Sequence, residues 1–115
     1  MGRPFYSPSE TGLYLSLIYC PENGITKPAV MTASAAVGVC RALKNVYGTD
    51  ARIKWVNDIF LNGRKVCGIL TEGVTNSRTG RIDAAIVGIG VNISSGESGF
   101  PGQIASVAGS VLGAT

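Results

Sequence analysis

Three short stretches of this 115-residue sequence hold polar and glycine residues at spacings that could support chemistry. The first reads KWVND at positions 54–58. A lysine, an amide and a carboxylate this close to Trp55, which we expect to be buried, suit a polar site at the end of a strand. They equally suit a turn in which Asn57 and Asp58 satisfy backbone groups, and the spacing alone favours the turn.

The second stretch begins with Arg64 and Lys65, which directly follow an Asn-Gly pair and precede Gly68. Two adjacent cations at the mouth of a hairpin are most often solvated. They could instead place a cation at the edge of a pocket floored by Gly68, because a strand glycine lets a flat ligand lie against the backbone. Both interpretations use the hairpin that the Asn-Gly pair predicts.

The third stretch contains Gly88, Gly90 and Asn92 at the end of a very apolar segment. It lacks the third glycine and the following helix of a dinucleotide-binding fingerprint, so we reject that assignment. The glycines indicate either bulges in a strand or a strand whose missing side chains make room for a ligand. In the second case Asn92 would offer hydrogen bonds at the end of the strand.

The composition excludes several classes of site. Histidine is absent, which excludes Ser-His and Cys-His nucleophilic sites and His-ligated metal sites. The 10 basic residues are spread along a chain of net charge +3, without the dense stripe that nucleic-acid binding favours. No apolar run reaches the roughly 18 residues of a membrane span. Three cysteines without a CxxC pair indicate free, mostly buried thiols in a reducing cytoplasm.

The pattern of apolar residues and the turn signals predict the strands that would position these residues. They are predicted over five segments: Gly12–Cys20, Ala51–Trp55, Asp58–Leu61, Arg64–Thr75 and Arg81–Ile93. With the helices below, this order predicts an α+β fold with a mixed, largely antiparallel sheet and helices packed on one face.

Two helices are predicted. The longer one spans Lys27–Tyr47 and stops at Gly48, a residue typical of helix ends. Its apolar residues recur every three or four positions: Val30, Ala33, Val37, Cys40 and either Leu43 or Lys44. The second begins at Pro101, after a Ser/Gly loop, and runs to the last residue.

The order of these motifs resembles one family. The run KWVNDIFLNGRKVCGILTE at 54–72, followed by VGIGVN at 87–92, is similar to the central catalytic domain of biotin–protein ligases, with their KWPND, K-x-x-G-I-L-x-E and G-x-G-x-N patterns. Upstream, GRPFYSPSETGLYLS resembles the end of the family's glycine- and arginine-rich biotin loop, and FPGQIASVAGS resembles the segment after the site. The resemblance implies the biotin–lipoate ligase-like fold, which is related to class II aminoacyl-tRNA synthetases.

The resemblance also implies a reaction. Biotin and ATP, with Mg²⁺, would form biotinyl-5′-AMP and pyrophosphate, and a lysine of the biotin carboxyl carrier domain of a carboxylase would then take the biotin. Lys65 matches the family's central lysine, which contacts the carboxylate and the α-phosphate and offsets their charge. Asp58 matches a carboxylate near the acceptor lysine, where it would orient the amine or help it lose a proton.

The remaining matches are binding positions. Residues matched to the biotin slot are Gly2, Lys65, Gly68, Leu70, Gly88 and Gly90. Those matched to nucleotide contacts are Arg3, Phe5, Lys65 and Asn92, and supporting positions are Lys54, Trp55 and Asn57. Phe5 stands where the family usually has a tryptophan that stacks on adenine.

The chain also departs from the family pattern. Val56 replaces the proline of KWPND. The strand that supplies hydrogen bonds to the ureido ring, the first arginines of the biotin loop, the small SH3-like C-terminal domain and any DNA-binding domain have no counterpart in residues 1–115. We therefore expect a partial catalytic domain that is weak or inactive alone and has open sheet edges through which it forms a homodimer. The alternatives are a lipoate or octanoyl ligase or transferase, or a non-catalytic binding or assembly module.

Overall fold

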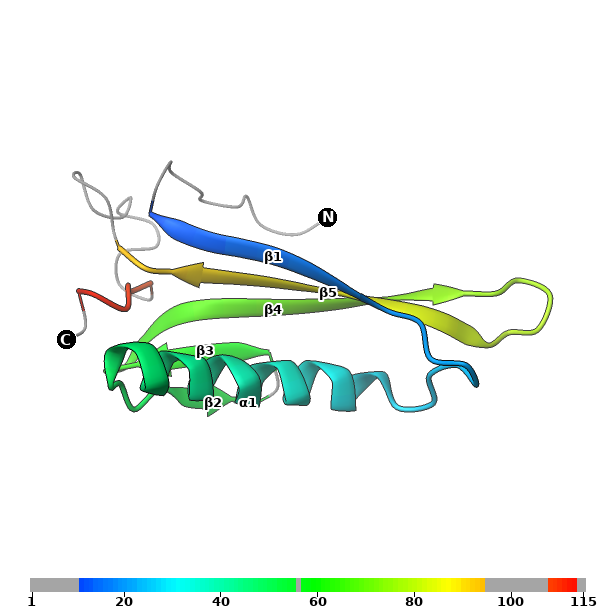
Figure 1. The fold of residues 1–115 in the computed structure, drawn as a ribbon, viewed down its shortest axis with the longest axis horizontal. Coiled ribbons are helices and arrows are strands. Elements are labelled where there is room, and N and C mark those ends of the chain that lie inside the picture. The colour runs from blue at the N-terminus through cyan, green and yellow to red at the C-terminus, as the bar shows by residue number, and fades with distance from the viewer. Residues whose placement is uncertain (1–10, 56, 95–107, 114–115) are drawn as a thin grey trace.

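The computed structural model describes residues 11–55, 57–94 and 108–113. In this part of the chain a five-stranded sheet carries one helix on one face (Figure 1). The elements are β1 (Gly12–Tyr19), α1 (Pro28–Tyr47), β2 (Arg52–Lys54), β3 (Asp58–Leu61), β4 (Arg64–Thr75) and β5 (Ile82–Asn92). The strands lie in the order β1-β5-β4-β3-β2, and all four neighbouring pairs are antiparallel. The predicted fold class is confirmed.

Tight turns explain why successive strands pair. Asn62 and Gly63 both have positive φ values, 52° and 78°, which asparagine and glycine tolerate and which suit the two-residue turn between β3 and β4. Between β4 and β5, the side chain of Asn76 accepts hydrogen bonds from the backbone N–H groups of Arg78 and Thr79. The first turn lies at the predicted Asn62-Gly63 pair, and the second lies between the predicted strands Arg64–Thr75 and Arg81–Ile93.

Helix α1 begins at a proline, whose fixed φ suits the first turn, and ends at Gly48 with φ 71°. Its bounds match the prediction to within one residue, and its predicted face was right only in part, because Leu43 is buried and Cys40 packs against the core. Val30 and Val37 are exposed, whereas Thr32, Ala36 and Leu43 are buried. Packing against the sheet determines which face of the helix is buried. Small side chains let the helix approach the sheet closely, and Thr32 Oγ1 lies 2.6 Å from Thr71 Oγ1 of β4.

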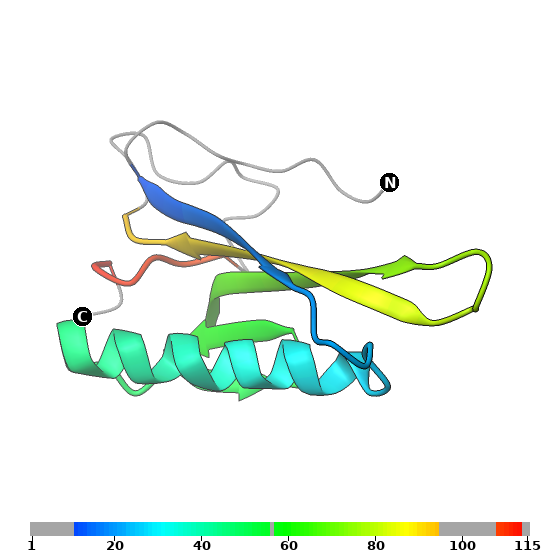
Figure 2. The same cartoon turned by 45° about the vertical axis from the view of Figure 1, so that its right-hand side comes forward.

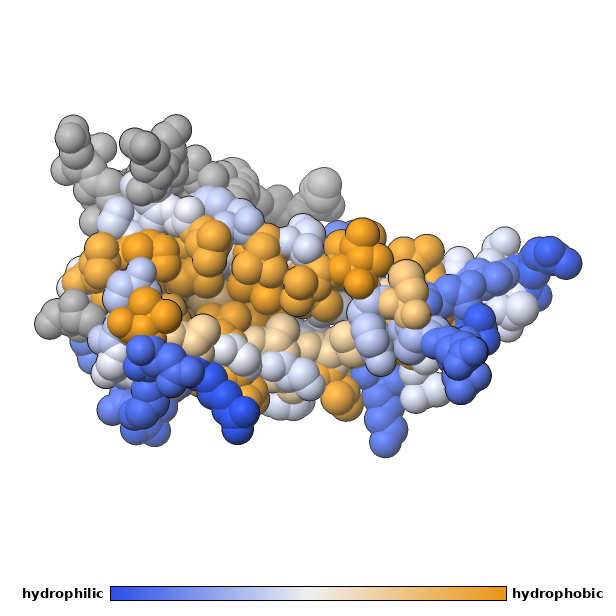
Figure 3. Space-filling model, in the orientation of Figure 1, coloured by the Kyte–Doolittle hydropathy of each residue, from blue (hydrophilic) through white to orange (hydrophobic). Residues whose placement is uncertain are grey.

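The core lies between α1 and the strands beneath it. Its most buried large side chains are Ile59, Val66, Cys67 and Val111. Helix α1 packs against β2, β3, β4 and β5 but makes no contact with β1 (Figure 2). Leu13, Leu15 and Leu17 of β1 are consequently exposed, and an apolar band lies beside the helix on the face seen in Figure 3.

The segment 108–113 differs from the prediction of a second helix. Ala108 forms a parallel bridge with Lys65, and a turn follows at 111–113. The backbone N–H groups of Gly109, Val111 and Leu112 donate to carbonyl groups of β4, β5 and Ile93, so they are not available for helical hydrogen bonds. The rest of that predicted helix, and the Ser/Gly loop beyond Ser94, lie outside the described residues.

Candidate functional site

A β-bulge in β4 orients the side chain of Lys65 toward the face of the sheet opposite α1, which we call the open face. Asp58 pairs with Gly68 and Ile59 with Cys67, but Phe60 pairs with Lys65, so Val66 is one extra residue in β4. In a regular strand, residues three apart point to opposite faces. The extra residue places Lys65 on the same face as Gly68 and Asp58. The bulge therefore explains how a K-x-x-G spacing forms one site.

Lys65 forms an ion pair across the strands with Asp58. Its Nζ lies 3.0 Å from Asp58 Oδ1, and the two side chains are 35% and 28% exposed. A Cβ placed on Gly68 would lie 3.5 Å from Lys65 Cε and Nζ, so the lysine side chain lies beside bare backbone. The structure thus brings together the two predicted catalytic residues and the predicted glycine floor. The pair is half-buried, so a ligand can reach it.

Two rows of residues cross the open face next to this ion pair. In the first row, Asp58 pairs with Gly68, Gly68 with Gly90, and Gly90 with Tyr14. In the second row, Leu70 pairs with Gly88, and Gly88 with Ser16. The glycines remove side chains from the middle of both rows and leave a platform of backbone on β4 and β5.

The interpretation of Gly88 and Gly90 as bulges was wrong. The pairings of β5 with β1 and β4 are regular at both glycines. The register shifts instead beside Lys65 and, at the other end of β4, beside Asp83. The alternative, in which missing side chains make room, is the one that agrees with the geometry.

The turn between β2 and β3 borders the same platform. The backbone carbonyl of Asn57 accepts a hydrogen bond of 2.9 Å from the Ile69 N–H, which fixes the turn against β4. Lys54 Nζ lies 5.5 Å from the centroid of the Phe60 ring, within the range of a cation–π contact. Trp55 is 76% exposed, so the expectation of a buried tryptophan was wrong.

Asn92 ends β5 and is partly buried beside the same face. It pairs with Gly12 across β1, and its backbone carbonyl accepts a hydrogen bond of 2.9 Å from the Val111 N–H. The other predicted binding residues, Gly2, Arg3 and Phe5, lie outside the described residues.

Comparison with known proteins agrees with this arrangement. The sequence profile described as the biotin/lipoate A/B protein ligase family matches residues 1–92. The chain belongs to this family.

Within this family, the chain is similar to individual biotin ligases in sequence and in structure. The chain is 35% identical over 111 residues to the bifunctional ligase/repressor BirA of Bacillus subtilis, covering 96% of the chain and 34% of that protein. It is 42% identical over 81 residues to the biotin–[acetyl-CoA-carboxylase] ligase of Paracoccus denitrificans, covering 69% of the chain and 33% of the relative. The Aquifex aeolicus biotin protein ligase in complex with biotin and ATP superposes with a TM-score of 0.70 at 28% identity, covering 90% of the chain and 40% of that structure. The chain spans about a third of the length of the two sequence relatives.

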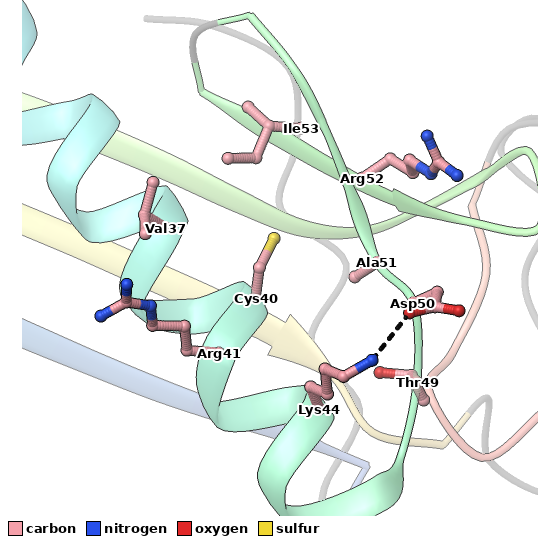
Figure 4. Close-up of a pocket in the computed structure, with 9 residues that line it drawn as sticks. All are labelled: Val37, Cys40, Arg41, Lys44, Thr49, Asp50, Ala51, Arg52 and Ile53. Atoms are coloured by element: carbon pink, nitrogen blue, oxygen red, sulfur yellow. Dashed lines mark hydrogen bonds and ion pairs between the residues drawn. The ribbon is translucent and has the colours of Figure 1, made fainter.

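A cleft lies on the helix side of the sheet, between α1 and residues 49–53 (Figure 4). It encloses about 360 Å³ and includes Cys40, Arg41, Thr49 and Arg52 in its lining. Thr49 Oγ1 is buried, and no hydrogen-bond partner for it is found within the described ranges. In Figure 4 the guanidinium groups of Arg41 and Arg52 point away from one another. These two cations therefore do not converge on a common ligand, whereas Lys65 and Asp58 lie together beside Gly68.

The three cysteines are free and differ in burial: Cys20 is exposed, Cys40 is partly buried and Cys67 is buried. The expectation of mostly buried thiols thus holds best for Cys67, which faces the core below the site. Burial, together with the nearby Cys40, raises the pKa of Cys67 to about 12. The thiol is therefore neutral near pH 7 and is not a nucleophile.

Neither a metal centre nor a membrane span is found in the part of the chain that the structure describes. No three His, Cys, Asp or Glu side chains gather there in a way that could hold a metal ion. No helix within the same ranges is long and apolar enough to cross a membrane.

Proposed function

We propose that this chain carries the central part of a biotin–protein ligase site, which makes biotinyl-5′-AMP from biotin and ATP and passes the biotin to a lysine of a carrier protein. The observation that carries the proposal is the Lys65–Asp58 pair, aimed by the bulge over a glycine platform. Family membership and the identity to ligases add to it.

In the first step a carboxylate oxygen of biotin attacks the α-phosphorus of ATP. A P–O bond forms, the bond to the leaving pyrophosphate breaks, and biotinyl-5′-AMP remains. Both reactants are anions, so they repel one another as they approach. The ammonium group of Lys65 would lie between them and stabilise the negative charge that builds up in the transition state. Magnesium enters with ATP as part of the nucleotide substrate.

The glycine platform would hold the biotin ring. Gly68 and Gly90 leave backbone exposed in one row, and Gly88 does so in the next. A flat bicyclic ring can pack on such a surface, while the exposed side chain of Leu70 provides an apolar edge. This arrangement would align the carboxylate of biotin with Lys65, and alignment of two reactants contributes much of the rate gain in such reactions.

In the second step the lysine amine of the carrier attacks the acyl carbon of the mixed anhydride, and AMP leaves. The amine must lose a proton, and Asp58 is the carboxylate placed to orient it or accept that proton. Before the reaction Asp58 is paired with Lys65. Anionic substrates that engage Lys65 would weaken this pair and make Asp58 available for the incoming amine.

The other site residues have supporting roles in this proposal. Asn92 would contact the nucleotide from the end of β5, and Lys54 would add positive charge near the phosphates. The fixed turn at Asn57 and the exposed ring of Trp55 would border the entrance for the carrier. By resemblance alone, Gly2 would belong to the biotin loop, and Arg3 and Phe5 would contact the phosphate and the adenine.

The partners in this proposal are biotin, ATP and the biotin carboxyl carrier domain of a carboxylase, with no nucleic acid. We also propose a cytoplasmic location and a homodimer. The dimer would form through β1, which is an edge strand of the sheet in the described residues and has Leu13, Leu15 and Leu17 exposed. Analytical ultracentrifugation of the chain and of Leu15→Lys would test it, because the added charge should yield monomer.

Pyrophosphate release tests the adenylation step. With ATP and magnesium, biotin should stimulate release more than lipoate does, because the KW-x-ND and G-x-G-x-N motifs favour biotin. Lys65→Ala should abolish the biotin-dependent release. Lys44→Ala is the matched control, since it removes a lysine whose ion pair with Asp50 lies on the helix side of the sheet. Release that depends on lipoate instead would transfer the assignment to lipoate ligases, and binding without release would indicate a binding module.

A further inference from the structure

The segment 108–111 occupies a special place beside Lys65. Strand β5 pairs with β4 as far as Cys67 and Val91, and it does not reach Lys65. Beyond that point Ala108 takes the place of β5 and forms a parallel bridge with Lys65. The Gly109 N–H donates to the Lys65 carbonyl at 2.8 Å. The bulged part of β4 is thus held on one side by β3 and on the other by this segment.

The same segment also holds the end of β5. The Val111 N–H donates to the carbonyl of Asn92 at 2.9 Å, and the Val111 side chain is fully buried in the core. Two hydrogen bonds, made by residues two apart, therefore connect the backbones of Lys65 and Asn92. These are the residues at the two strand ends that the proposed site needs at a constant separation.

Gly109 is the point of closest approach in this connection. It is buried, and a Cβ placed on it would lie 2.7 Å from Arg64 Cβ. Neither atom can be moved by rotating a side chain, because both Cβ positions are set by the backbone. Any larger residue must therefore push the segment away from β4 and stretch or break the hydrogen bond to Lys65.

We infer that Gly109 is a positioning residue for Lys65: its lack of a side chain lets segment 108–111 hold the bulge and keep the lysine aimed at the platform. This inference rests on the proposed function. It assigns a role to a residue that touches no reactant, at a distance in sequence from the site motifs. Displacements of about 1 Å in such a position can cost about 10²-fold in rate.

A double-mutant cycle tests this inference. Gly109→Ala should lower kcat for biotin-dependent pyrophosphate release by about tenfold or more, with a smaller change in KM for biotin. Arg64→Gly removes the Cβ that an alanine at 109 would meet. The double variant should therefore release pyrophosphate at the rate of Arg64→Gly alone. Thermal unfolding of each variant separates loss of the fold from loss of position.

A second readout does not depend on activity. The side-chain Cε signal of Lys65 in a ¹H–¹³C NMR spectrum should shift in Gly109→Ala and should return in the double variant to its position in Arg64→Gly. If the unmodified chain releases no pyrophosphate, the proposed adenylation by this chain alone fails, which is the outcome expected of a partial domain that is inactive alone, and the NMR comparison still decides the role of Gly109. An unshifted Lys65 signal in Gly109→Ala, or a double variant that stays shifted, would overturn the inference.

Discussion

Strand β4 pairs irregularly with a neighbour near each of its ends, and an ion pair lies at each irregularity. At one end the extra residue is Val66 and the pair is Lys65–Asp58; at the other end the extra residue is Asp83 and the pair is Arg81–Asp83. The second pair is local. Asp83 accepts hydrogen bonds from Arg81 and Asn76, and together they close the turn that projects beyond α1 in Figure 1.

The two ends differ in what surrounds the charges. Lys65 and Asp58 come from different strands and lie next to backbone left bare by glycine. Arg81 and Asp83 are two residues apart in an exposed hairpin, where Asp83 accepts one hydrogen bond from Arg81 and one from Asn76. A bulge and an ion pair are therefore not enough to indicate a site. Space beside the charges and a core that holds them distinguish the end with the proposed site from the other end.

The largest expected difference between the two ends is in the transfer step. Asp58→Asn should slow transfer of biotin from preformed biotinyl-5′-AMP to a carrier lysine by about 10²-fold or more, because the amine loses its carboxylate partner. Asp83→Asn is the matched control and should transfer at the normal rate. Single-turnover transfer kinetics measure both. Equal effects of the two substitutions would remove the distinction between the two ends.

The platform should be sensitive to a single methyl group. In Gly88→Ala the new Cβ would lie 3.7 Å from the Leu70 carbonyl oxygen, an ordinary contact, so the fold should persist. The methyl group would still occupy the biotin slot, and we expect the Kd for biotin to rise about tenfold, or about 1.4 kcal/mol. Calorimetric titration measures this change.

Gly38→Ala provides the control for that substitution. Gly38 lies on α1 with no atom within 4 Å of an added Cβ. Biotin binding should be unchanged, and the free energy of unfolding should rise by up to about 1 kcal/mol because alanine favours the helix. Unchanged biotin affinity in Gly88→Ala would mean that the ligand does not lie on this platform.

The Arg81–Asp83 pair at the other end of β4 should make the stability of the fold depend on pH in acid. The hydrogen bonds from Arg81 and Asn76 lower the pKa of Asp83 below its ordinary value of 3.8. A carboxylate with a lowered folded-state pKa stabilises the fold above the unfolded pKa, and this contribution is lost as pH falls through the folded pKa. Asp83→Asn should therefore flatten the loss of stability below about pH 4, as followed by urea unfolding from pH 2 to pH 5. An identical pH dependence in both proteins would show that this pair contributes no stability.

The smallest expected effect is at Trp55, beside the proposed site. Because the ring is largely exposed, Trp55→Ala should change the free energy of unfolding by no more than about 0.5 kcal/mol. Urea unfolding measures it. A loss above about 2 kcal/mol would show that another part of the protein covers the ring.

Local signals explain which features the sequence predicts well. The turn at Asn62-Gly63 and the end of α1 at Gly48 depend on residues that tolerate positive φ. Such features can be predicted from the residue types at and next to these positions. The strand bounds of β3 and β4 follow from that turn and from apolar patterning. The juxtaposition of Lys65 with Asp58 was expected from the family resemblance and not from spacing.

Features set by packing could not be predicted in this way. The position of the extra residue, Val66, depends on how β3 and β4 align, and no residue type near it in the sequence indicates a bulge. The buried face of α1 depends on which side chains the sheet accepts, which favoured Thr32 and Ala36 over the larger Val30 and Val37. The pairing of Ala108 with Lys65 joins residues far apart in the chain, so a helix was predicted there instead.

The central claim is that biotin binds at the Lys65 end of β4 and not at the Asp83 end. The most direct measurement is a ¹H–¹⁵N NMR titration of the chain with biotin, with ATP and magnesium present and absent. Binding at the Lys65 end should shift the amide signals of Lys65, Gly68, Gly88 and Gly90, while the signals of residues 76–83 stay in place. Shifts confined to residues 76–83 or to α1, or no shifts in a folded protein, would contradict it.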